Sequence, residues 1–123
     1  MDNQRRFDFK VKYHFYKESE GGRKTLPFNG YRSDWLYDGD DLYVEGLSII
    51  WPTFENESGE ILENQISVLR DGFARMTVVV PEIRISTHQQ RIKIGTKGFF
   101  MEGSRKVAKA EVVEILDLHK DEI

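Results

Sequence analysis

Residues 20–32 of the chain read Glu-Gly-Gly-Arg-Lys-Thr-Leu-Pro-Phe-Asn-Gly-Tyr-Arg. Within this stretch, Gly21-Gly22, Pro27 and Asn29-Gly30 interrupt regular secondary structure, because Gly and Asn accept a positive φ and Pro lacks an N–H donor. We therefore expect a loop over residues 17–30, with a strand on either side of it.

The segment before this loop carries the clearest strand signal in the chain. Its apolar positions are Phe7, Phe9, Val11, Tyr13 and Phe15. The positions between them are Asp8, Lys10, Lys12, His14 and Tyr16. A period of two indicates a strand with one buried face and one face in water. We expect the aromatic set to face the core and the charged set to face solvent.

The rest of the chain predicts further short strands separated by turns. The expected strands cover residues 31–37, 42–51, 61–69 and 73–80, with a hairpin at Asp71-Gly72 and a further alternating segment at residues 83–94. The segment after residue 104 fits a helix face or a strand face, and its periodicity leaves both open. Many short strands with Gly, Pro and Asp turns predict an all-β barrel or sandwich.

Two segments resemble the third domain of translation elongation factor Tu. One is Gly21-Gly22-Arg23-Lys24-Thr25 with Pro27-Phe28 and Gly30-Tyr31-Arg32; the other is Glu102-Gly103-Ser104-Arg105-Lys106-Val107-Ala108. The chain departs from the family at Ser33, where the family has Pro, and at Met101, where it has Arg. At 123 residues the chain fits one domain over residues 1–123, with a core from about 7 to 118. The resemblance agrees with this, because it covers nearly the whole chain. It also implies a closed antiparallel six-stranded barrel whose last segment is a strand.

The resemblance also implies a candidate site on one rim of the barrel. In that family these loops help to hold the tRNA backbone. The matching candidates for binding RNA or another partner are Arg23, Lys24, Gly103, Arg105 and Lys106. The alternative is structural: the Arg23 guanidinium would bond loop carbonyls and order residues 17–30.

Charge is distributed unevenly along the sequence. Residues 1–32 carry a net +4 and residues 91–109 a net +5, whereas residues 33–71 carry −9 and residues 111–123 carry −4. If the two basic segments meet in space, they form a positive face that attracts an anionic partner. The alternative is a set of solvated strands, because exposed lysines also prevent edge-to-edge aggregation.

Motifs for catalysis, metals and nucleotides are missing from the sequence. The chain has no Cys, its three His are far apart, and Gly95-Thr96-Lys97-Gly98 lacks the length and order of a phosphate-binding loop. We therefore expect no enzyme activity, no cofactor, no metal and no nucleotide binding.

The functional expectation is a stand-alone, non-catalytic binding module. Its partner is expected to be a protein, with backbone binding of tRNA or another RNA by the basic rim as the alternative. Trp51, Phe54, Phe99 and Phe100 are candidates for partner anchors or for core filling. Because neither an apolar leader nor a membrane-length apolar run is present, we expect a cytoplasmic protein without membrane contact.

Overall fold

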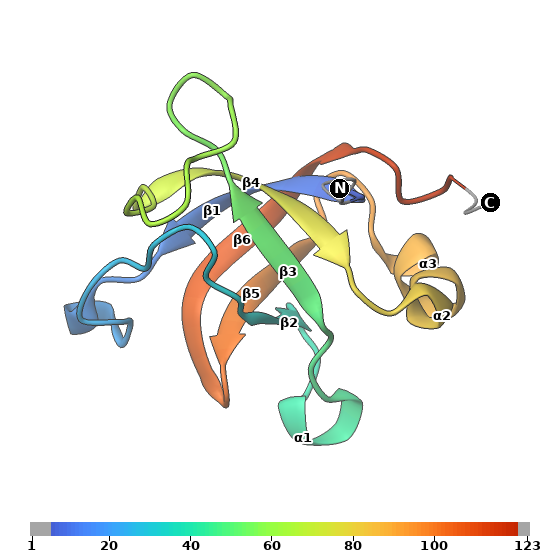
Figure 1. Ribbon diagram of the computed structural model, residues 1–123. Helices are drawn as coiled ribbons and strands as arrows, with labels where there is room; N and C mark the ends of the chain where they lie inside the picture. Colours follow the sequence, from blue (N-terminus) through green and yellow to red (C-terminus); the bar gives the residue numbers. More distant parts are fainter. Residues whose placement is uncertain (1–5, 121–123) are drawn as a thin grey trace.

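The strands of the chain form one curled antiparallel sheet (Figure 1). A computed structural model describes residues 6–120. The strands are β1 (Phe9–Phe15), β2 (Asp34–Tyr37), β3 (Ile50–Phe54), β4 (Asp71–Val78), β5 (Lys97–Glu102) and β6 (Arg105–Ile115). Their order across the six-stranded sheet is β2-β5-β6-β1-β4-β3.

The sheet curls into an open half-barrel, whereas the sequence led us to expect a closed barrel. The edge strands β2 and β3 meet at only one bridge outside the named strands, where Trp35 and Ser48 exchange both backbone hydrogen bonds at 2.9 Å. Because β2 has four residues and the chain then leaves the sheet, a continuous ladder between the two edges does not form.

The inside of the curl holds the aromatic core. Phe9, Tyr13, Phe15, Trp35 and Phe100 are at most 2% exposed, and their rings meet mainly edge to face. The predicted apolar face of residues 9–15 is thereby confirmed. The strand assignment for the last segment is confirmed as well, since β6 is the longest strand and pairs with β1 and β5.

Asp8 contradicts the expectation that its face of the first strand lies in water. Its side chain is fully buried, with Oδ1 3.2 Å from Arg84 Nε and 2.8 Å from Arg6 Nε. Its other oxygen accepts the Val78 N–H at 2.8 Å. A carboxylate can be buried when cations and a backbone donor satisfy it.

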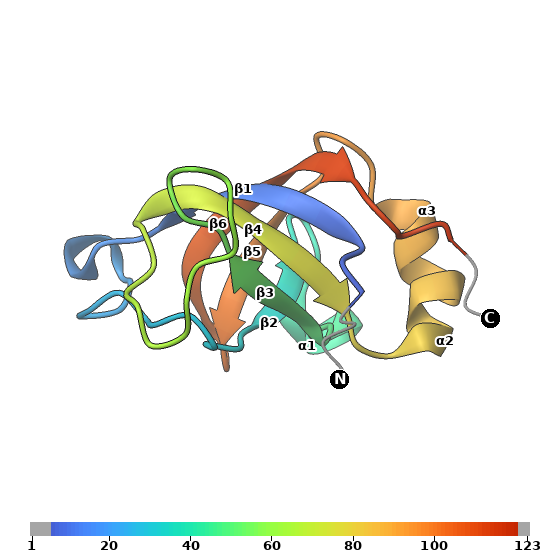
Figure 2. The ribbon, with the colours of Figure 1, turned by 45° about the horizontal axis from the view of Figure 1, so that its top comes forward.

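Residues 81–91 are helical, although their alternating Ile and Arg residues predicted a strand. They form α2 (Pro81–Ile83), the π-helical turn η2 (Arg84–His88) and α3 (Gln89–Arg91), at one end of the sheet (Figure 2). Pro81 suits the first turn of a helix because its missing N–H has no partner there. Arg84 and His88 lie four residues apart, are both buried, and reach Asp8 and Tyr37 respectively.

The prediction of a strand at residues 61–69 and of a hairpin at Asp71-Gly72 is wrong. These two residues are the first two of β4, whose edges are already occupied by β1 and β3. The segment at 61–69 pairs instead with the earlier loop, through a Phe28–Ser67 bridge and the Val68 N–H bond to the Pro27 carbonyl at 2.9 Å.

The expected strand over residues 42–51 is split between two elements. Residues Leu42–Glu45 form a single helical turn, α1, and β3 runs on through Pro52. Asp41 caps α1 by accepting the Tyr43 N–H at 2.8 Å. Pro52 is tolerated because β3 is an edge strand. A short turn, η1 (Glu18–Glu20), lies in the loop after β1. Among the described residues, no helix is long and apolar enough to cross a membrane.

Candidate functional site

The first candidate site is a cluster of charged groups around one carboxylate, which we call the rim cluster: Arg23, Tyr31, Glu102 and Arg105. Glu102 Oε2 accepts Arg23 Nη1 and the Tyr31 hydroxyl, both at 2.5 Å. Glu102 Oε1 accepts Arg105 Nη2 at 3.4 Å. Both arginines predicted from the two sequence segments therefore converge on the same acid.

Local structure positions each member of the rim cluster. Glu102 ends β5, Arg105 starts β6, and Gly103 takes a positive φ of 60° in the tight turn between them. Arg23 also donates from Nε to the Thr25 carbonyl at 3.0 Å, and its guanidinium lies 5.3 Å from the Tyr31 ring centroid. Arg23 thus bonds a loop carbonyl, as the structural alternative required.

The contacts of Glu102 change its acidity. Partial burial by itself raises the pKa of Glu102, but the hydrogen bonds from Tyr31 and Arg23 outweigh it and lower the pKa below its ordinary value. Burial, together with the Glu102 hydrogen bond, raises the pKa of the Tyr31 hydroxyl. Glu102 is therefore ionised at neutral pH and neutralises part of the positive charge of the arginines.

The two remaining candidates lie apart from this carboxylate. Lys24 is exposed and forms no ion pair within residues 6–120. Lys106 is exposed as well, and its Nζ lies 4.1 Å from the centroid of the Phe99 ring. This contact with Phe99 directs attention to the outer face of the sheet, where a second candidate site lies.

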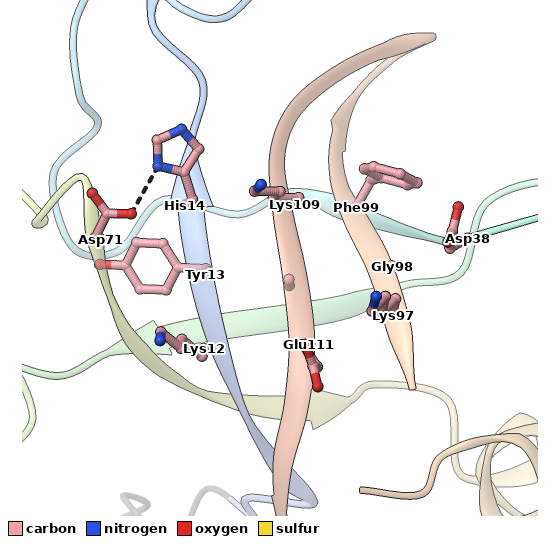
Figure 3. A pocket seen from close by; sticks show the side chains of 11 residues that line it. Lys12, Tyr13, His14, Asp38, Asp71, Lys97, Gly98, Phe99, Lys109 and Glu111 are labelled. Carbon is pink, nitrogen blue, oxygen red and sulfur yellow. Dashed lines mark hydrogen bonds and ion pairs between the residues drawn. The ribbon is translucent and has the colours of Figure 1, made fainter. Parts of the chain in front are cut away.

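The second candidate site is a depression of about 540 Å³ on the outer face of β1, β6 and β5 (Figure 3). We call it the outer-face depression. Its lining consists of Lys12, Tyr13, His14, Asp38, Asp71, Lys97, Gly98, Phe99, Lys109, Ala110 and Glu111.

Strand register brings the outward side chains of the depression together. Lys12 lies opposite Glu111, which lies opposite Lys97 on the next strand. In the neighbouring row Lys109 lies between His14 and Phe99. Side chains directly opposite on adjacent strands have Cβ atoms about 5 Å apart, so they form one continuous surface.

The charges in the depression are poorly matched with one another. Lys12, Lys97 and Lys109 form no ion pair with any described residue. His14 is the exception, because its Nδ1 lies 2.7 Å from Asp71 Oδ1 (Figure 3). The lining therefore offers three lysines without ion-pair partners beside a half-buried aromatic ring, together with the carboxylates of Asp38, Asp71 and Glu111.

Sequence reasoning did not find the depression. The alternation of residues 7–16 placed Lys12 and His14 on a polar face, but only strand pairing reveals that Lys97, Phe99 and Lys109 adjoin them. The only sequence signal for the depression was the net positive charge of residues 91–109. This charge did not indicate that β1, with Lys12 and His14, lies beside them.

Two of the four aromatic residues weighed as partner anchors fill the core. Phe54 and Phe100 are fully buried. Trp51 is half-buried, with the Arg32 guanidinium 5.1 Å from its ring centroid. Only Phe99 of the four adjoins a candidate site.

The titratable pair Tyr37–His88 lies inside the fold rather than in either site. The Tyr37 hydroxyl and His88 Nδ1 are 2.6 Å apart, and His88 is 1% exposed. Burial, and then the charge of Arg91, lower the pKa of His88 from 6.5 to about 4. Among residues 6–120, no group of three His, Asp or Glu side chains is arranged to hold a metal ion.

In comparisons with known proteins, no family model matches the chain and no curated protein is significantly similar to it.

Proposed function

We propose that this chain is a non-catalytic, stand-alone binding module of the elongation factor Tu third-domain type, and that it engages a protein partner through the outer-face depression. One observation carries the proposal. The depression presents three lysines without ion-pair partners among the described residues, next to the half-buried ring of Phe99. Aromatic residues are enriched at protein interfaces, and charged groups on a surface steer a partner of complementary charge.

The mixed charge of the lining favours a protein over a phosphate backbone. Three carboxylates, those of Asp38, Asp71 and Glu111, lie among the three lysines. A regularly charged phosphate chain would meet these carboxylates and be repelled. A protein segment can place acids beside the lysines and an apolar group beside Phe99, so its charges can be complementary.

The rim cluster supports a second candidate, which is backbone binding of RNA. Arg23, Lys24, Arg105 and Lys106 supply four cations against the single carboxylate of Glu102. The surplus of +3 would attract phosphates, and each neutralised phosphate adds a salt-dependent increment to affinity. Arg23 contributes less than the others, because Glu102 and Thr25 already occupy its guanidinium.

The two candidates are separated by capture from cytosolic lysate with paired variants. If the protein proposal is right, one partner survives nuclease treatment, is lost with Lys97→Glu/Lys109→Glu, and is retained with Lys24→Glu/Arg105→Glu. If RNA binding is right, the captured material is nuclease-sensitive, falls steeply with salt, and is lost with the second pair. A partner that survives nuclease and both variants would contradict both sites.

A further inference from the structure

A short apolar tip projects from the sheet between β2 and β3 (Figure 1). It consists of residues 41–46, which contain α1, and we call it the α1 tip. Tyr43 is 86% exposed and Val44 is 75% exposed. An aromatic and an aliphatic side chain exposed at consecutive positions of one turn place apolar surface within reach of a partner.

The α1 tip is held in a fixed shape. At its N-terminus Asp41 accepts the Tyr43 N–H at 2.8 Å, and Glu45 accepts the Asp41 N–H at 2.6 Å. Just before the tip, Asp40 accepts two hydrogen bonds from Arg91, at 2.8 and 2.9 Å. Arg91 in turn lies 3.9 Å from the Tyr37 ring centroid. A tip held in this way loses little conformational freedom when it docks.

The tip and the depression carry complementary chemistry. Asp41 and Glu45 belong to the tip and form no ion pair among the described residues. Lys12, Lys97 and Lys109 in the depression also form none. The depression is concave and contains an aromatic ring, whereas the tip is convex and ends in one.

The two surfaces are also neighbours on the molecule. Asp38 lines the depression and lies three residues before the tip begins. In a dimer with a two-fold axis, two adjacent and complementary patches contact each other reciprocally. The tip of each copy then lies in the depression of the other.

We propose that the partner of the outer-face depression is a second copy of this chain, whose α1 tip enters it. Tyr43 of each copy contacts Phe99 of the other, and the acids flanking each tip face Lys97 and Lys109. This inference rests on the proposed function and specifies the acidic, aromatic protein segment that the depression accepts.

The oligomeric state tests the inference directly. Sedimentation of the full chain should show a monomer–dimer equilibrium at concentrations up to about 1 mM, weakened by added salt. Tyr43→Ser should weaken the dimer at least tenfold, because an aromatic anchor is lost. Lys120→Glu, a charge reversal on an exposed lysine outside both surfaces, should leave it unchanged. A monomer throughout this range would overturn the inference.

Mixing two charge variants distinguishes docking from a loss of folding. Val44→Lys should repel the lysines of the depression, and Lys97→Glu should repel the acids of the tip, so each variant alone should be monomeric. Mixed together they should form a heterodimer, because one contact is charge-swapped and the other is native. If both variants stay monomeric in the mixture, the reciprocal contact does not exist.

A peptide separates failure of this inference from failure of the proposed function. The probe is a synthetic peptide with the sequence of residues 38–46, titrated into isotope-labelled protein. If the depression accepts the tip, chemical-shift changes should appear around Lys97, Phe99 and Lys109 and should disappear in Lys97→Glu. If the peptide binds and the chain is monomeric, the depression accepts such segments but a second copy does not supply one. If neither peptide binding nor a dimer is seen, the inference is overturned, and the capture experiment with Lys97→Glu/Lys109→Glu decides the proposed function separately.

Discussion

The rim cluster and the outer-face depression are both rich in cations, but they differ in whether those cations have partners. In the rim cluster, Glu102 binds Arg23, Tyr31 and Arg105 at once. In the depression, Lys12, Lys97 and Lys109 have no such acid. Charges that are already satisfied within the fold contribute to stability, whereas unsatisfied ones remain available to a partner. The positive charge of a segment alone therefore does not locate a binding site.

The largest expected effect comes from Gly98, a lining residue of the depression that we expect to be structural. A Cβ at this position would lie 2.3 Å from Cζ2 of the buried Trp35 ring. Gly98→Val should therefore lower the free energy of unfolding by about 3 kcal/mol or more, through overpacking. Urea denaturation measures this change in the free energy of unfolding. The control is Lys97→Val, which places the same side chain at the exposed neighbouring position. Equal stability of the two variants would show that Trp35 can move.

The second prediction concerns His88, a buried group whose Nδ1 is hydrogen-bonded to Tyr37. Its folded pKa of about 4 lies below the unfolded value of 6.5, so only the unfolded state takes up a proton between these pH values. Stability is then full above pH 6.5 and falls by up to about 3 kcal/mol as the pH drops to 4. Denaturation at a series of pH values should show this loss.

His88→Gln provides the control for this pH dependence. The variant should be less stable than the parent at pH 7, but it should lose less stability between pH 6.5 and 4, because the titrating group has been removed. If both proteins lose stability in parallel over this range, a different group is responsible for the slope.

Glu102→Gln tests the rim cluster and should have a smaller effect. The variant leaves Arg23 and Tyr31 with a weaker acceptor, and we expect a loss of about 1–2 kcal/mol at pH 7, moderated by solvent screening. The folded pKa of Glu102 is lowered from 4.5. Its contribution to the free energy of unfolding is therefore complete above pH 4.5 and is lost as the pH falls through the lower, folded pKa. The difference from the parent should therefore vanish in acid.

A matched exposed acid provides the comparison for Glu102. Glu114 contacts Lys10 at only 3.8 Å and its side chain is 55% exposed. Glu114→Gln should change the free energy of unfolding by less than about 0.5 kcal/mol. If it matched Glu102→Gln, the rim cluster would have no special role in stability.

The smallest expected effect on stability belongs to the depression. Lys97→Ala/Lys109→Ala should leave the free energy of unfolding within about 0.5 kcal/mol of the parent, since no described acid pairs with either lysine. The same variant should weaken dimerisation or partner binding at least tenfold. If this variant lost much stability but bound its partner as before, the lysines of the depression would be structural, as we expect the rim cluster to be, and would not be binding residues.

The sequence predicted the elements that depend on local pattern and turn chemistry. The alternation at residues 9–15 identified β1 and its buried face. Short strands separated by turns identified a mostly antiparallel β protein. Patterns failed where long-range partners are involved. The buried Asp8 is paired with Arg84, and the helical residues 81–91 bring Arg84 and His88 to Asp8 and Tyr37.

The two candidate sites also differ in how far the sequence predicted them. The two segments with a family resemblance pointed to Arg23, Gly103 and Arg105, and these residues lie together around Glu102, although their role in binding stays a prediction. No sequence signal placed Asp71 beside His14, or Phe99 beside Lys109. Those contacts depend on strand order and register, which alternation along one strand does not specify.

The sequence by itself determined that the chain folds around an aromatic strand face, that residues 17–30 form a loop rich in Gly and Pro, and that most of the cations lie in two separate segments. These properties follow from the alternation of apolar and polar side chains and from the backbone preferences of Gly and Pro, which act over a few residues. Only the tertiary structure decided that the sheet stays open between β2 and β3 and which cations receive an acid. It also brought three lysines without acid partners into one concave surface. The physical reason is that pairing between distant strands, and not local preference, determines which side chains become neighbours.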